Sequence, residues 1–103
     1  MEMKKLNRTK VQKINLPYKN SAADTLKEFL EFEKITQTEF AGKIGVTQKH
    51  VSDILNRKKW LTPLLAVRIE QEFGLPARFL LRKDMNYKLD LAQQEQNYHI
   101  MEG

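Results

Sequence analysis

Polar side chains that can read nucleic-acid bases cluster around residue 50. Gln48 can form two hydrogen bonds with adenine, Lys49 can donate to the O6 and N7 atoms of guanine, and Ser52 can bond several bases. A second set can hold phosphate groups, which positions a protein on DNA without reading its sequence. Its members are Gln37, Thr47, Asn56, Arg57 and Lys58. The pattern predicts a surface that binds double-stranded DNA.

The sequence offers no arrangement typical of an enzyme or a metal site. It has no cysteine, which excludes disulfides, thiolate metal sites and a cysteine nucleophile. We find no glycine-rich phosphate loop and no serine or aspartate with an obvious histidine partner. His50 and His99 are 49 positions apart and have no nearby cluster of ligands. We therefore expect no catalysis, no metal and no cofactor.

Positive charge is unevenly distributed along the 103 residues, whose formal net charge is +5. Residues 1–19 carry +5 and residues 36–61 carry +3, whereas residues 20–35 carry −2 and residues 62–103 carry −1. Clustered Lys and Arg are typical of nucleic-acid binding. No apolar run is long enough to cross a membrane or to form a secretory signal. Since cysteine is absent, the chain suits a reducing cytoplasm.

Hydrophobic periodicity predicts an all-α chain of five or six short helices. Four glycines and three prolines are few for an all-β protein, which needs many turns. The expected helices cover residues 22–34, 37–44, 48–56 and 63–73, a further helix from residue 76, and a weakly amphipathic segment over residues 84–96. Phe79 and Leu80 are expected to face the core.

Two helix-start signals lie eleven residues apart in the middle of the chain. Thr36 and Glu39 form a capping box, and Thr47 caps the next helix. Between them, Gly45 can adopt the left-handed conformation that ends a helix. Ala41 is small where the two helix axes approach closely. Two short helices joined in this way predict a helix-turn-helix.

The second helix of this motif has a buried and an exposed side. If Val51, Ile54 and Leu55 face the core, helical geometry directs the polar residues outward into a major groove. The outward set is Gln48, Lys49, Ser52, Asp53 and Asn56. Asp53 would repel phosphate, so it would have to accept from cytosine or remain unused.

We divide the chain into a basic N-terminal arm (1–20), a helix-turn-helix domain with a C-terminal helical extension (21–96) and a frayed tail (97–103). A solvated tail is an equal alternative for the arm. Trp60 either leans on DNA or packs against the fourth helix. Met85, Tyr87 and Leu91 form a partial stripe that suits either a dimer face or docking onto the same chain.

The segment TQTEFAGKIGVTQKHVSDILNRKKWLTPLLAVRIEQEFGLPARFLLRKDMNYKLDLAQ resembles the Xre/Cro-type helix-turn-helix family. Within it, LTPLLAVRIEQEFGLPARFLL followed by NYKLDL resembles the HigA antitoxins of bacterial toxin–antitoxin modules. The resemblance covers about Leu26–Gln93 and implies a lambda-repressor-like domain of five to six helices. It also implies a sequence-specific repressor that neutralises a ribonuclease-type toxin in a HigBA-like module and autoregulates its promoter as a homodimer.

The chain departs from the family pattern in three places, the first being the unusually long and basic leader Met1–Asn20. Asn20-Ser21-Ala22-Ala23 replaces the usual proline–glycine pair, and Leu80 stands where tryptophan is common. Two other functions therefore stay open: a phage or mobile-element repressor without a toxin, and a protein-interaction module on the same fold. Asp53 and the acidic first helix favour the interaction module, whereas Gln48 and Lys49 favour DNA binding.

Overall fold

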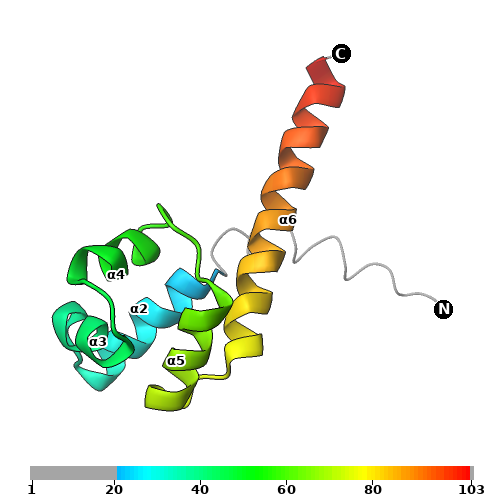
Figure 1. The fold of residues 1–103 in the computed structure, drawn as a ribbon. Coiled ribbons are helices and arrows are strands. Elements are labelled where there is room, and N and C mark those ends of the chain that lie inside the picture. Colours follow the sequence, from blue (N-terminus) through cyan, green and yellow to red (C-terminus); the bar gives the residue numbers. More distant parts are fainter. Residues whose placement is uncertain (1–20, 103) are drawn as a thin grey trace.

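The computed structural model describes residues 21–102, and the regular secondary structure over this range is entirely helical. The helices are α2 (Ala22–Glu33), α3 (Gln37–Ile44), α4 (Gln48–Leu55), α5 (Pro63–Phe73) and α6 (Ala77–Glu102). Figure 1 shows α2 to α5 gathered into a globule, with α6 running along its side and projecting beyond it. The predicted basic arm (1–20) and residue 103 lie outside the described residues. The all-α prediction is confirmed.

Each of the four shorter helices has a hydroxyl residue at its N-cap position, and the hydroxyls of Thr36, Thr47 and Thr62 each accept a backbone N–H. The caps are Ser21, Thr36, Thr47 and Thr62. At the start of α3, the N–H of Glu39 donates to the hydroxyl of Thr36 at 3.0 Å, and the N–H of Thr36 donates to the Glu39 carboxylate at 2.9 Å. This reciprocal pair is the predicted capping box, and it satisfies N–H groups that have no partner within the helix.

The ends of α3 and α5 are set by the two glycines that the sequence marks. Gly45 has φ 78° and Gly74 has φ 82°, both in the left-handed region that side chains with a Cβ rarely adopt. The end of α3 has a further support, because Nη1 of Arg68 donates to the carbonyl of Ile44 at 3.2 Å. The turn between α3 and α4 is therefore held from α5 as well as by its own glycine.

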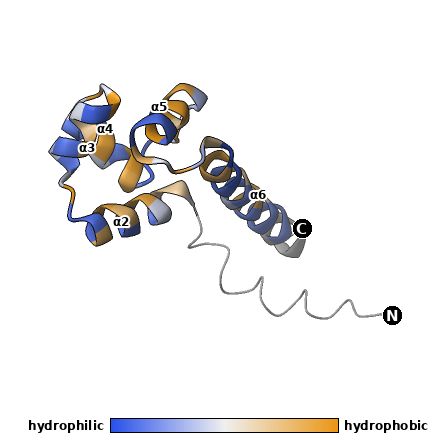
Figure 2. Ribbon diagram, turned by 90° about the horizontal axis from the view of Figure 1, so that it is seen from below, coloured by the Kyte–Doolittle hydropathy of each residue, from blue (hydrophilic) through white to orange (hydrophobic). Residues whose placement is uncertain are grey.

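The core lies where the four short helices meet the first turns of α6. Its largest fully buried apolar side chains are Phe40, Leu26, Ile44, Ile69, Leu80 and Val51. The ring of Phe73 stacks on Phe40 with centroids 4.9 Å apart and meets Phe29 edge-on at 5.7 Å. Figure 2 shows that the globular helices have apolar and polar sides, whereas the projecting part of α6 is largely hydrophilic.

Helix α6 differs from the sequence prediction in three respects. It is one continuous helix of 26 residues, so the segments from residue 76 and over 84–96 are one element. Leu80 is fully buried, but Phe79 is 42% exposed, because neighbouring residues point about 100° apart around a helix. Trp60 packs on Tyr87 of α6, with ring centroids 5.9 Å apart, a contact that the sequence did not predict. No helix within residues 21–102 has the length and apolar character needed to span a membrane.

Candidate nucleic-acid interface

Helices α3 and α4 pack against each other and are the two helices of the predicted helix-turn-helix. Their facing side chains are all buried: Phe40, Ala41, Ile44, Val51, Ile54 and Leu55. At the turn, the N–H of Val46 donates to the carbonyl of Ala41 at 3.0 Å. Because this packing fixes both helices on the core, the N-terminal turn of α4 stands at the surface with Gln48 and Lys49 exposed.

The first residues of α3 and α4 are joined by a side-chain hydrogen bond. Nε2 of Gln48 donates to Oε1 of Gln37 at 2.7 Å. The structure thus brings together a residue predicted to read bases and one predicted to lie over the phosphate backbone. The bond fixes the direction of the Gln48 amide, yet its oxygen and second N–H keep the capacity to pair with adenine.

The other predicted contact residues of α4 lie along the same helix. Ser52 is half-buried, and Nδ2 of Asn56 donates to its carbonyl at 2.9 Å and to its hydroxyl at 3.3 Å. Thr47 is exposed and accepts a hydrogen bond of 3.1 Å from the N–H of His50. Thr47 and Asn56 therefore secure the two ends of α4, where exposed polar atoms can also reach phosphates.

The prediction that Asp53 faces outward is wrong. Asp53 is 9% exposed, and its carboxylate lies 3.3 Å from Nζ of Lys49 and 4.0 Å from Nζ of Lys59. The chain after α4 folds back over this residue, because the N–H groups of Lys58 and Lys59 both donate to the carbonyl of Asp53 at 2.8 and 3.2 Å. Asp53 is consequently a buried acceptor between two lysines and does not present a bare negative charge to DNA.

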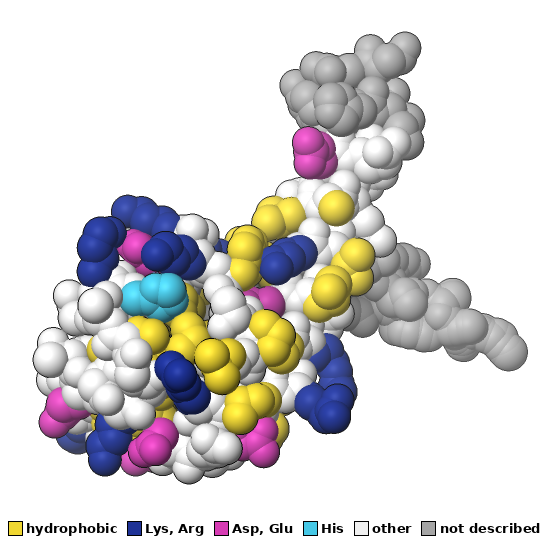
Figure 3. Space-filling model, in the orientation of Figure 1, with side chains coloured by type: hydrophobic (Ala, Val, Ile, Leu, Met, Phe, Trp, Pro, Cys, Tyr) yellow, Lys and Arg dark blue, Asp and Glu magenta, His cyan; other side chains and the backbone are white. Residues whose placement is uncertain are grey.

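Exposed lysines lie on α4 and in the loop that follows it. Lys49 in the first turn of α4 and Lys59 in the loop have side chains that are 82% and 52% exposed, and Lys58 in the same loop is also exposed. Figure 3 shows Lys and Arg side chains gathered over this end of the globule and several Asp and Glu side chains toward its lower edge. The surface that presents α4 is therefore electropositive.

Comparison with known protein families identifies this arrangement. A family model described as helix-turn-helix matches residues 26–80, which include α3, the turn and α4. The chain belongs to the helix-turn-helix family. In DNA-binding helix-turn-helix motifs the second helix enters the major groove, and α4 has that position in this chain.

The helix-turn-helix fold is also found in a solved structure. A protein from Nostoc punctiforme, provisionally described as an antidote protein of a plasmid maintenance system, superposes on this chain with a TM-score of 0.75 and 20% sequence identity. The match covers 79% of this chain and 89% of the other. At this identity the likeness concerns the fold. A comparison with curated protein sequences finds no match.

Arg57, unlike its exposed neighbour Lys58, contacts residues elsewhere in this helix-turn-helix domain. Nη2 of Arg57 lies 2.6 Å from the Asp24 carboxylate, and its Nε donates to the Ser21 hydroxyl at 3.1 Å. The guanidinium carbon also lies 4.8 Å from the centroid of the Tyr87 ring. The side chain predicted to hold a phosphate therefore joins the loop after α4 to α2 and α6.

The contacts of Asp24 change its acidity. Burial by itself would raise the pKa of Asp24, but hydrogen bonds from the N–H of Ser21 and from Arg57, together with the positive charge of Arg57, hold that pKa below its ordinary value. Asp24 is thus ionised wherever the domain is folded near neutral pH. Nothing local in the sequence connects Asp24 with Arg57, 33 positions later.

Two residues that support the site were missed by sequence reasoning. Lys59 belongs to the basic run NRKK, and that run was the available signal. Asp84 has no such signal: it is 5% exposed in α6 and accepts hydrogen bonds from the N–H of Ala22 at 2.8 Å and of Leu61 at 3.3 Å. One carboxylate therefore holds both the start of α2 and the chain that follows the basic loop.

Proposed function

We propose that the chain is a sequence-specific DNA-binding repressor in which α4 reads the major groove. The observation that carries this proposal is the 2.7 Å hydrogen bond from Gln48 to Gln37, which orients an exposed side chain at the end of α4 that meets the bases. Membership of the helix-turn-helix family supports the same role for α4. The burial of Asp53 between lysines removes the main electrostatic objection to it.

The experiment is selection of preferred duplexes from a randomised DNA pool, followed by binding measurements on the operator so defined. Gln48→Ala should weaken operator binding by about 1–3 kcal/mol and relax the preference at one or two base pairs. Gln94→Ala is the matched control, because Gln94 is an exposed glutamine on α6. Operator binding that is indifferent to Gln48→Ala and Lys49→Ala together would show that another surface reads the DNA.

The repressor acts, in this proposal, as a two-fold homodimer on a pseudo-palindromic operator. Apolar side chains on α6 support a contact with a second copy, since Met85, Leu89 and Leu91 are 56%, 51% and 40% exposed. Tyr87, from the same predicted stripe, is instead half-buried against Trp60. Analytical ultracentrifugation tests the dimer: Leu89→Asp should lower the sedimenting mass toward that of one chain and weaken operator binding.

We infer further that this repressor is the antitoxin of a HigBA-like module and autoregulates its promoter. The support is the resemblance of residues 61–81 and 86–91 to HigA antitoxins and the fold shared with the Nostoc antidote protein. Co-expression with the protein encoded beside this gene is the test. A neighbour that inhibits growth alone, and that co-purifies with this chain, fits a ribonuclease-type toxin. A solitary gene or a harmless neighbour leaves a phage or mobile-element repressor.

A further inference from the structure

Helix α2 exposes a large aromatic side chain to solvent. Phe32 is 82% exposed, the highest value among the large apolar residues that the structure describes. Glu28, Glu31 and Glu33 are exposed on the same helix. An aromatic residue that contributes nothing to its own core and is surrounded by charged residues has the composition of an interface anchor with a polar rim.

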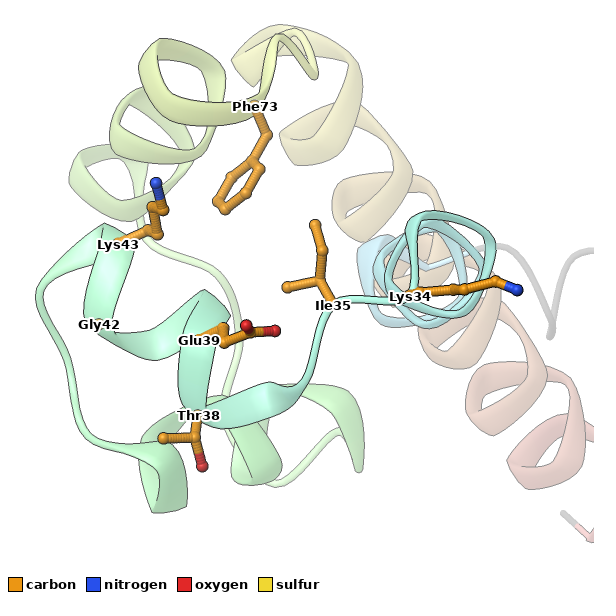
Figure 4. A pocket seen from close by; sticks show the side chains of 7 residues that line it. All are labelled: Lys34, Ile35, Thr38, Glu39, Gly42, Lys43 and Phe73. Carbon is orange, nitrogen blue, oxygen red and sulfur yellow. The ribbon is translucent and has the colours of Figure 1, made fainter.

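A hollow lies beside the C-terminal end of α2. It has a volume of about 510 Å³ and is lined by Lys34, Ile35, Thr38, Glu39, Gly42, Lys43 and Phe73. Figure 4 shows the side chains of Ile35 and Phe73 pointing toward each other across it, with Glu39 and Lys43 at its α3 side. The hollow therefore has apolar walls and a charged rim, and it is large enough to accept a side chain from another molecule.

Aromatic contacts connect the hollow with the exposed ring. Phe73 in the hollow meets Phe29 edge-on at 5.7 Å between ring centroids. Phe29 stands three positions before Phe32 on α2, and residues at this spacing are neighbours on a helix surface. Phe29, Ile35 and Phe73 are packed against the core, and Phe32 projects from the same helix as Phe29; we call these four residues the docking face. It consists of a protruding ring next to a recess.

The charge around the docking face selects its partner. Helix α2 contains four acidic residues and one lysine, and the ion pairs found within residues 21–102 involve none of its three glutamates. DNA is therefore repelled from this face. A second copy complements this face poorly, because residues 21–102 carry 12 Lys and Arg against 12 Asp and Glu and so have no net charge. A basic protein, in contrast, complements the acidic residues of α2.

We propose that the docking face binds the basic toxin of the proposed module, with Phe32 inserted into an apolar pocket of that protein. An apolar toxin side chain enters the hollow between Ile35 and Phe73, and toxin Lys or Arg residues pair with the glutamates of α2. This inference rests on the proposed antitoxin function and assigns its partner a surface apart from α4. DNA and toxin can then be bound by the same chain at the same time.

The test uses the full chain and the protein encoded beside its gene, titrated against each other by calorimetry. Phe32→Ala should weaken binding at least about 30-fold, the loss expected for an interface anchor. Leu64→Ala is the matched control: Leu64 is 59% exposed on α5, and its removal should change the affinity less than about twofold. The variant Glu28→Gln/Glu31→Gln should weaken binding at low salt and reduce its salt dependence.

Folding does not confound this comparison. Phe32 lies outside the core and alanine is the better helix former, so Phe32→Ala should keep the melting temperature and the operator affinity of the parent chain. Equal binding by the parent and Phe32→Ala overturns the docking face and leaves the antitoxin function standing. No binding by the parent overturns both. If light scattering of the Phe32→Ala variant without the toxin shows a changed mass, the docking face binds a second copy. If the variant loses operator binding, the face binds DNA. Either result overturns the proposal.

Discussion

The carboxylate of Asp84 in α6 accepts a hydrogen bond of 2.8 Å from the backbone N–H of Ala22, 62 positions earlier in the chain. Its second oxygen accepts from the N–H of Leu61 at 3.3 Å. Asp84→Ala should lower the free energy of unfolding by about 2–4 kcal/mol, because each buried N–H without an acceptor costs about 1–3 kcal/mol. Urea denaturation measures this loss, and Asp90→Ala, at a partly exposed position of α6, is the control. Equal stability of the two variants would contradict the prediction.

The ion pair of Asp24 with Arg57 should make stability depend on pH in the acid range. The pKa of Asp24 is lower in the folded than in the unfolded chain, so folding favours the ionised carboxyl group. This stabilisation is present above the unfolded pKa of about 4 and is lost as the pH falls through the folded value. Asp24→Asn should therefore reduce stability near neutral pH and flatten its decline below about pH 4. Unfolding curves collected from pH 2 to 7 measure both effects.

Three glycines make a matched set for the helix-turn-helix geometry. Gly45→Ala should lower stability by about 1–2 kcal/mol, since φ is 78° and the new Cβ would meet Nη1 of Arg68 at 3.3 Å. Gly74→Ala should cost less, because φ is 82° but nothing lies within 4 Å of the new atom. Gly42→Ala, inside α3 with open space around it, should raise stability by about 0.5–1 kcal/mol. Thermal unfolding should rank Gly42→Ala as the most stable, then Gly74→Ala, then Gly45→Ala. Any other order would contradict the backbone conformations described for these glycines.

Lys58 should contribute to DNA affinity without contributing to sequence preference. Lys58→Ala should weaken binding to operator and unrelated duplexes alike. It should also reduce the slope of log binding constant against log salt concentration by about one, because a lysine bound to a phosphate releases about one counterion. Lys27→Ala on α2 is the control, since that lysine lies on the acidic helix. Fluorescence anisotropy over a range of salt concentrations gives both slopes. An unchanged slope for Lys58→Ala would remove it from the phosphate contacts.

The basic arm is expected to add affinity for DNA without adding stability. Its charged residues Lys4, Lys5, Arg8, Lys10 and Lys13 can follow phosphates or enter a minor groove. Deletion of residues 1–13 should therefore weaken operator binding at low salt and leave the melting temperature almost unchanged. A large fall in melting temperature would instead mean that Val11 and the apolar residues after the deletion point are packed into the fold.

Local signals predicted the helices well. Thr36 with Glu39, Thr47, and Thr62 with Pro63 mark helix starts through contacts three or four residues apart, and the sequence contains all of this information. Gly45 and Gly74 mark helix ends for a similarly local reason. The buried stripes of α2 to α5 follow from helical period alone, so the fold class and the two helices of the helix-turn-helix could both be predicted.

Contacts between distant residues could not be predicted in this way. Asp53 has the spacing of an exposed residue, and only the return of the loop with Lys59 buries it. Arg57 belongs to a basic run that suggests phosphate binding, yet Asp24 lies 33 positions away and holds it. Asp84 occurs in a weakly amphipathic segment where nothing distinguishes it from a surface carboxylate. Each of these residues depends on how the helices pack.

The division of α4 into a buried and an exposed side has an evolutionary consequence. Val51, Ile54 and Leu55 hold the helix on the core, whereas Gln48 is exposed and the exposed Lys49 pairs with Asp53. If α4 reads DNA as proposed, mutations at Gln48 can exchange one operator for another at little cost in stability, whereas changes at Lys49 also remove an ion pair of Asp53. Descendants of a duplicated gene could acquire separate promoters through a few such steps while keeping the same scaffold. The same freedom makes these positions the natural place to retarget the protein by design.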